Sequence, residues 1–426
     1  MPMNSPRRRD AGAIVRSARL AKGLTLAELG RLTGYSSSQV SRYERGIAPL
    51  TDTAALRNFA AALSLPPQTF GLAPNVGGSA NRPPLVAVRA VTDHASAVVL
   101  SDTTHASRAD DTISRLADLV YGQKPTNAQP ISLTDLRAET DQARGLLQAA
   151  RYEQLTASLP RLIATATATR DAANDQDRQA VEALLADAYI AASAFMVKID
   201  DHQLTWTTAD RALQSAAASG DPLTLADAQR SVAVAMRRTG RPDRARSLLI
   251  DASDAIAPGY AATREQLSMY GTLLQVAAYT AAVDGDQEQA NELITAAHAT
   301  AVRLGGDANH RYTAFGPTTV SLYHVSIAQA LGDNGTAIQH AKMVNPATIP
   351  TPERRGRYWI RVARAWHQWG KLDACYRSLL MAERVAPAEV RFRPVVRRIA
   401  HDLLRTARSG AMPGLRAFAE RVGVLA

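Results

Sequence analysis

Residues 23–46 read GLTLAELGRLTGYSSSQVSRYERG, and this stretch predicts two short helices joined by a tight turn. Thr25 can cap a first helix that presents Leu26, Leu29 and Leu32 on one side. Gly34 then supplies a turn in which a positive φ costs little, and a second helix follows until Gly46 ends it. Two helices linked in this way form a helix-turn-helix.

The exposed face of the second predicted helix is polar along its whole length. It carries short hydrogen-bonding side chains near its beginning and two guanidiniums toward its end, namely Ser36, Ser37, Ser38, Gln39, Ser41, Arg42 and Arg45. Such a face suits the major groove of double-stranded DNA, where side chains read base edges. From the residues alone, a helical hairpin with a solvated polar face stays open as the alternative.

With the helix before it, this segment resembles the Xre/Cro-type phage-repressor DNA-binding domain, through the arrangement R-x-x-x-G-L-T-x-x-E-L-x-x-x-T-G-x-S-x-S-x-V-S-R-x-E-R-G. The resemblance covers about residues 10–72 and implies a five-helix, lambda-repressor-like domain. It implies an internal ion pair between Arg19 and Glu44. It also implies which side chains face base edges, Ser37, Ser38 and Arg42, and which lie nearer the sugar-phosphate backbone, Gln39 and Arg45. The chain departs from the family at Leu26, where a Gln usually contacts a phosphate, so the resemblance implies no phosphate contact there.

The length and charge of the chain indicate more than one domain. A chain of 426 residues is too long for one compact core, and its low aromatic content of 5% favours helix packed on helix. Residues 1–72 hold 10 basic and 4 acidic side chains, residues 353–426 hold 16 and 6, and the middle holds 23 and 29. The basic N-terminal part fits phosphate neutralisation.

The location that the sequence predicts is the cytoplasm, in association with the nucleoid. Cys375 is the only cysteine, so no intramolecular disulfide can form, which favours a reducing compartment. Arg7, Arg8 and Arg9 resemble the start of a signal peptide, but no apolar core follows them, and a flexible arm that touches the DNA backbone is the better interpretation. We find no apolar run that approaches a membrane span and expect no membrane partner.

The sequence divides into a helix-turn-helix domain at 1–72, a linker at 73–130 and a helical repeat domain at 131–426. The linker begins with PNVGGSANRPP and contains at most a short strand at 85–91 or 96–100. Beyond it, Ala-rich amphipathic blocks recur, and the best copy is residues 358–387, whose large and small residues resemble a tetratricopeptide repeat. Weaker copies turn at Ala150, Gly240, Gly285 and Gly332. A generic all-α bundle stays open as the alternative.

Tetratricopeptide repeats bind ligands along a concave groove, and the corresponding faces of these blocks are rich in Arg, Gln and Tyr. In the best copy, Arg357, Arg361 and Arg364 share one stripe. The same face of the earlier copies contributes Arg230, Gln275, Tyr279 and Tyr323. These seven residues are our candidate ligand-binding residues for a signalling peptide or a small anionic ligand. Pairing of the three arginines with acidic neighbours, or their exposure to water, is the alternative.

No catalytic constellation accompanies these features. The sequence contains no phosphate-binding G-x-x-x-x-G-K-[ST] loop, no H-E-x-x-H and no C-x-x-C, so we expect no enzyme, metal or cofactor. The architecture resembles peptide-sensing regulators of Gram-positive bacteria, in an actinobacterial version, and implies a homodimer that binds an operator. Two other hypotheses stay open: a repeat domain that docks another regulator while the small domain anchors to DNA, and an effector in which the small domain is a vestige.

Overall fold

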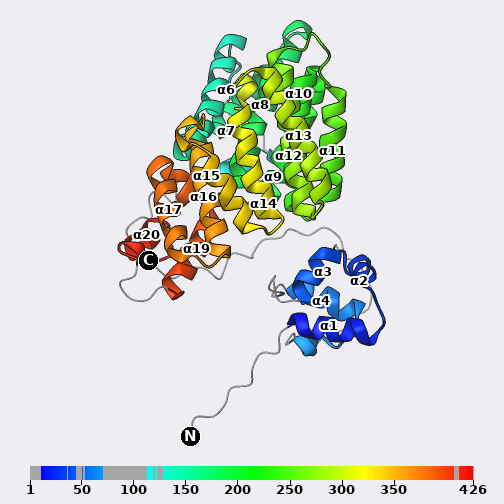
Figure 1. Ribbon diagram of the computed structural model, residues 1–426. Helices are drawn as coiled ribbons and strands as arrows, with labels where there is room; N and C mark the ends of the chain where they lie inside the picture. Colours follow the sequence, from blue (N-terminus) through cyan, green and yellow to red (C-terminus); the bar gives the residue numbers. More distant parts are fainter. Residues whose placement is uncertain are drawn as a thin grey trace. The chain divides into compact units, whose positions relative to one another are not determined.

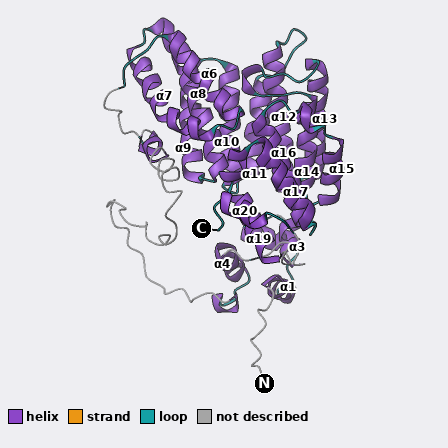
Figure 2. Cartoon of the chain, turned by 90° about the vertical axis from the view of Figure 1, so that its left-hand side faces the viewer, coloured by secondary structure: helices purple, strands orange, loops and turns teal. Residues whose placement is uncertain are grey.

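The computed structural model describes residues 11–35, 37–44, 50, 53–70, 113–118, 120–121, 128–406 and 412–425. The chain forms two compact units, residues 1–96 and 97–426. Every regular element in the described ranges is a helix (Figures 1 and 2), which confirms the all-α prediction. The strands predicted at 85–91 or 96–100 lie outside the described residues.

The first unit contains four α-helices and a 3₁₀-helix: α1 Ala11–Ala21, α2 Leu26–Thr33, α3 Ser37–Glu44, α4 Thr53–Ala62 and η1 Pro67–Phe70. Thr25 begins α2 through a capping box. Its side chain accepts a hydrogen bond from the Glu28 N–H, and the Glu28 carboxylate accepts one from the Thr25 N–H at 2.7 Å. Gly34 ends α2 with a φ of 75°, a conformation that glycine adopts without the steric cost of a side chain. The predicted helix-turn-helix is therefore confirmed.

The core of the first unit joins all four of its α-helices. Val15, Leu29, Val40 and Phe59 are fully buried in it, and the Tyr35 ring stacks on Phe59 with 5.5 Å between centroids. Our expectation that Leu32 shares the apolar face of α2 is wrong, because its side chain is 60% exposed. Each three-residue step turns a helix by 300°, so a third leucine at this spacing rotates off the face that the first two share.

The second unit is a succession of helices that begins earlier than the predicted repeat domain. Residues 113–118 are helical, and Leu116 and Val120 are buried in its first core, although they fall in the segment predicted to be linker. The helices that follow are α6 Leu133–Gln148, α7 Tyr152–Ala172, α8 Asp175–Ile199, α9 His202–Ser219, α10 Pro222–Arg238, α11 Pro242–Ala255, α12 Arg264–Asp284, α13 Gln287–Leu304, α14 Pro317–Ala330, α15 Asn334–Met343, α16 Pro352–Gln368, α17 Leu372–Val385, α18 Pro387–Arg391, α19 Pro394–Thr406 and α20 Leu415–Arg421. Figure 1 shows them stacked from cyan to red.

Five helical hairpins form the middle of this unit, namely α8 with α9, α10 with α11, α12 with α13, α14 with α15 and α16 with α17. The first helix of each hairpin contacts the first helix of the next, so these first helices form one layer. The predicted turns at Gly240, Gly285, Gly332 and Gly370 all have a positive φ. In the best predicted copy, Ala363, Cys375, Leu379 and Ala382 are fully buried. This arrangement confirms the repeat-like α-solenoid.

The end of the solenoid packs back onto its beginning. Phe392, just after α18, contacts the rings of Tyr152 on α7 and Phe195 on α8, with centroid distances of 5.8 and 5.7 Å. Glu389 on α18 has no exposed surface and accepts a hydrogen bond from the Tyr152 hydroxyl. The last helices of the solenoid thus narrow the space that the layer of first helices surrounds.

One helix, α8, is long and apolar enough to cross a membrane by length and composition, contrary to our expectation of no such run. The fold buries 72% of the apolar window of this helix. Burial of this kind is typical of the central helix of a helical domain, and α8 contacts α6, α7, α9 and α10.

Candidate DNA-binding face and ligand cavity

The predicted recognition helix is α3, and its orientation follows from two buried residues. Val40 is fully buried and Glu44, one turn later, is 8% exposed. Arg42 lies 200° around the helix from Val40, so its position is on the side that faces away from the core. Gln39, Ser41 and Arg42 are half-buried at their positions on α3. Ser36 and Arg45 lie outside the described residues, as do the side chains of Ser37 and Ser38.

The predicted ion pair of Arg19 and Glu44 is confirmed and fixes α3 to α1. The Arg19 Nε and Nη2 atoms donate to the two carboxylate oxygens of Glu44 at 2.6 and 2.8 Å, and Nη1 donates to the Leu24 carbonyl at 2.8 Å. The hydrogen bond to Glu44 raises the pKa of Arg19. A two-pronged contact of this kind restricts rotation of α3 about its axis, because both planar groups must stay aligned.

The second unit contains a cavity of about 290 Å³ inside the layer of first helices. Its walls come from α6, α8, α10, α12, α14, α16 and α19 and from the loop of residues 305–316, which we call the strap. No residue of α9, α11, α13, α15 or α17 lines it. All seven candidate ligand-binding residues lie on its wall: Arg230, Gln275, Tyr279, Tyr323, Arg357, Arg361 and Arg364. The structure therefore brings them together, and their binding of a ligand stays a prediction.

The cavity wall carries eleven cationic side chains: Arg144, Lys198, Arg230, Arg237, Arg238, Arg311, Arg354, Arg357, Arg361, Arg364 and Arg393. Seven of them form ion pairs with six carboxylates. The pairs join Arg144 to Asp187 and Asp227, Arg230 to Asp227, Arg238 to Asp200, Arg311 to Asp221, Lys198 to Glu353 and Glu389, Arg357 to Glu353, and Arg393 to Glu389. The alternative that we left open for Arg357 therefore holds for that residue.

Four guanidiniums on the wall, those of Arg237, Arg354, Arg361 and Arg364, have no carboxylate partner within 4.0 Å among the described residues. Burial, together with the charge of Arg357, lowers the pKa of Arg354 and of Arg361 to about 10, and burial lowers the pKa of Arg237. Arg237 donates only to the Thr280 hydroxyl at 2.9 Å, and Arg361 to the Ser326 hydroxyl. The wall thus holds positive charge that the protein does not neutralise.

Two of these guanidiniums lie over tyrosine rings. The Arg237 guanidinium lies over the Tyr279 ring at 4.8 Å, and Arg361 lies over the rings of Tyr279 and Tyr323 at 5.4 and 5.8 Å. Burial acts to raise the pKa of Tyr279, but Arg361, Arg237 and Arg364 outweigh it and lower that pKa. Cation–π contacts place the guanidiniums without consuming all of their N–H donors.

The amide of Gln275 is a second group on the cavity wall that lacks a polar partner. Its side chain has no exposed surface, and neither its Oε1 nor its Nε2 atom has a hydrogen-bond partner in the described structure. Buried amides are nearly always hydrogen-bonded, since an unpaired one costs about 1–3 kcal/mol. The cavity thus offers both a donor and an acceptor at this position.

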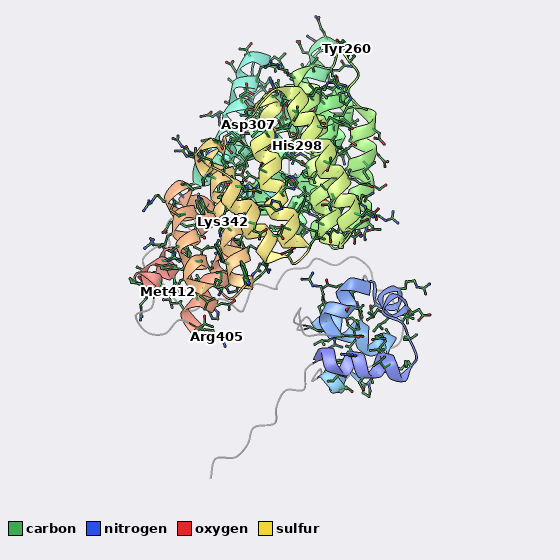
Figure 3. All side chains as sticks on the ribbon, in the orientation of Figure 1. Tyr260, His298, Asp307, Lys342, Arg405 and Met412 are labelled. Atoms are coloured by element: carbon green, nitrogen blue, oxygen red, sulfur yellow. The ribbon has the colours of Figure 1, made fainter. Side chains whose placement is uncertain are left out.

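The strap closes one side of the cavity and was missed by the sequence analysis. It begins near Asp307, labelled in Figure 3, and its ends meet where the Ala308 N–H donates to the Phe315 carbonyl at 3.0 Å. Arg311, Tyr312 and Ala314 have φ values of 49°, 59° and 45°, a region costly for residues with a side chain. The Tyr312 hydroxyl donates to Asp141 at 2.8 Å and the Gln148 amide to the Tyr312 carbonyl at 2.9 Å. These contacts to α6 hold the strap in its conformation.

Other sequence features have structural roles. Burial raises the pKa of the Cys375 thiol to about 12, which makes it an inert core residue. Among the described residues, no group of three His, Cys, Asp or Glu side chains is placed to hold a metal ion. His298, labelled in Figure 3, lies on α13 outside the cavity wall.

Comparison with known proteins supports the first unit directly. Residues 10–70 match the family described as "Helix-turn-helix domain", so the chain has an N-terminal helix-turn-helix domain followed by a helical C-terminal domain. No curated protein matches the chain. Among solved structures, the chain is similar to Bacillus thuringiensis PlcR in its complex with the peptide PapR7 and DNA, at 13% identity and a TM-score of 0.30, over 87% of this chain and 98% of that one.

Proposed function

We propose that this protein is a sequence-specific DNA-binding transcription regulator. Its helical domain joins two protomers and binds an anionic ligand in the cavity. The observation that carries the proposal is the match of residues 10–70 to a helix-turn-helix domain, together with the orientation of α3 by Val40 and Glu44. A basic small domain with a polar, outward recognition helix is the arrangement that reads a major groove. The cytoplasm, near the nucleoid, is where such a protein works.

Dimerisation follows from the size of the small domain. One domain of this kind reads a single half-site, and operators of such proteins have two half-sites about 34–36 Å apart. A two-fold contact between helical domains brings a second helix-turn-helix domain to the DNA and restricts the distance between the two domains. We therefore expect a homodimer on a palindromic site.

The cavity supports ligand sensing because it combines a volume suited to a small molecule with unneutralised charge. Four guanidiniums without carboxylate partners and one unsatisfied amide lower the stability of the folded protein unless a ligand pairs with them. A ligand changes DNA affinity only if it binds one arrangement of the protomers better than the other. A tenfold change in operator affinity requires about 1.4 kcal/mol of such preference.

The experiment is selection of random duplex DNA with the full chain, followed by footprinting and light scattering of the complex. We expect one enriched palindrome and a mass of two chains per site. If no sequence is enriched, the proposal of a sequence-specific regulator is wrong. That result would favour a helical domain that docks another regulator. A complex with one chain per palindrome would reject the dimer and leave base reading intact.

A further inference from the structure

The chemistry of the cavity wall specifies the ligand more narrowly than an anionic ligand of any kind. The volume, about 290 Å³, lies just below the usual range of small-molecule pockets, roughly 300–1,000 Å³. The strap and the packing of α18 on α7 and α8 narrow this groove, which stays partly open to solvent. An extended chain advances about 3.3 Å per residue and needs an open path for its length. The small volume therefore favours a compact molecule over an extended peptide.

The charge on the wall requires a high density of negative charge in that small volume. Arg237, Arg354, Arg361 and Arg364 lack carboxylate partners among the described residues, and each guanidinium presents five donors in a planar fork. Such forks match phosphate oxygens bidentately. A terminal phosphoryl group carries about −1.5 to −2 charges at pH 7, whereas a carboxylate carries one, so two linked phosphoryl groups offset most of the charge of the four guanidiniums.

The amide of Gln275 indicates a second, uncharged part of the ligand. Its donor and acceptor are both unsatisfied and fully buried, and it lines the cavity with Val234, Val276 and Tyr279. An amide beside apolar and aromatic surface pairs well with a flat group that has a donor and an acceptor on one edge. A nucleobase has such an edge, whereas an ionised carboxylate has acceptors only.

We propose that the cavity binds a small molecule with two phosphoryl groups and one uncharged donor–acceptor edge, of the nucleoside diphosphate class. The guanidiniums of Arg237, Arg361 and Arg364 hold the phosphoryl groups, and Gln275 holds the uncharged edge. This inference rests on the ligand-binding cavity of the proposed function and names its ligand class.

The test is calorimetric titration of the full chain with ADP, inorganic pyrophosphate, citrate and a tri-glutamate peptide, in parallel with thermal unfolding. We expect ADP and pyrophosphate to bind at least tenfold more tightly than citrate or the peptide. Gln275→Leu should weaken the binding of ADP at least fivefold and leave the affinity for pyrophosphate unchanged. Arg361→Gln should weaken the binding of ADP and of pyrophosphate at least tenfold.

A second readout separates a binding role of Arg361 from a structural one. A structural role of Arg361 would lower the unfolding temperature of the ligand-free Arg361→Gln protein, whereas a binding role removes the rise in unfolding temperature that ADP produces in the parent. Arg364→Gln repeats the test if Arg361→Gln does not fold. The control is Arg161→Gln, since the Arg161 side chain is 69% exposed on α7, outside the cavity.

Two results would overturn the ligand class: equal affinity for citrate and pyrophosphate, or parental phosphate binding by both arginine variants. Tighter binding of the peptide than of ADP would overturn it as well. Selection of an operator by the same preparation distinguishes this failure from that of the proposed function, because DNA selectivity does not depend on which molecule fills the cavity.

Discussion

The guanidinium of Arg361 on α16 lies over the ring of Tyr279 on α12, with 5.4 Å between its central carbon and the ring centroid. It also lies over Tyr323 on α14, so a single side chain joins three consecutive first helices. The contact places a cation in the centre of the cavity wall without a carboxylate that would neutralise it. The relationship therefore serves the packing of the solenoid and the electrostatics of the cavity at once.

Tyr279 tests the packing part of this relationship. Replacing Tyr279 with Leu removes the ring that lies below Arg237 and Arg361, and we expect it to destabilise the helical domain by about 2–4 kcal/mol. Tyr279→Phe keeps the ring and should stay within about 1 kcal/mol of the parent. Denaturant unfolding followed by circular dichroism measures both variants. Tyr260→Leu is the control, because Tyr260 is fully exposed at the tip of the α11–α12 loop (Figure 3). Equal losses for Leu and Phe would contradict a role of the ring.

Asp227 predicts how the stability of the helical domain depends on pH. Burial opposes ionisation of Asp227, but Arg230 and Arg144 outweigh it and lower its pKa from 3.8 to about 2. A lowered folded-state pKa contributes stability above the unfolded pKa near 4, and this stability is lost as the pH falls toward 2. The contribution is about 2 kcal/mol. Urea unfolding between pH 6 and pH 2 should show it.

The matched variant for this prediction is Asp227→Asn, which keeps the shape of the side chain and removes its charge. We expect it to be less stable than the parent at pH 6 and to lose less stability on acidification. Asp251→Asn, at an exposed position on α11, should behave like the parent. A parental acid profile for Asp227→Asn would show that other carboxylates set the dependence.

The ion pair of Glu44 with Arg19 should contribute to the stability of the first unit. Replacing Glu44 with Ala leaves the Arg19 guanidinium buried without its partner, at a cost of about 3–5 kcal/mol. Because the pair lies within the first unit, we expect Glu44→Ala to unfold that unit and to leave the helical domain folded. Calorimetry of a fragment of residues 1–72 measures the first unit by itself. An unchanged melting profile of the Glu44→Ala fragment would reject the role of the pair.

Arg42 predicts base reading by α3. Arg42→Ala should cost about 1–3 kcal/mol on the selected operator and relax the base preference at one position of each half-site. Arg16→Ala, at an exposed position on α1, is the control for general charge loss and should weaken all DNA alike. Gel-shift titrations on operator and random duplex measure the difference. Equal losses for Arg42→Ala on both duplexes would exclude base reading by this residue.

The local spacing of residues in the sequence determined much of this protein. Thr25 and Gly34 predicted the start and end of α2, because helix caps depend on residues close together in the sequence. The 357, 361, 364 spacing placed three arginines on one side of α16. Helical periodicity is a local property, so one sequence suffices to predict which residues share a face.

Only the tertiary structure decided what those faces meet. The predicted groove is a partly open cavity of limited volume, because Tyr152 and Glu389, 237 residues apart, join the beginning of the solenoid to its end. The strap is stabilised by contacts from Tyr312 to Asp141 and from Arg311 to Asp221, and no local pattern predicts these contacts. The same holds for the division of the eleven cations into seven paired and four unpaired. Pairing across helices depends on which side chains the closed arrangement brings within 4 Å, and that distance is set by the packing of the whole domain.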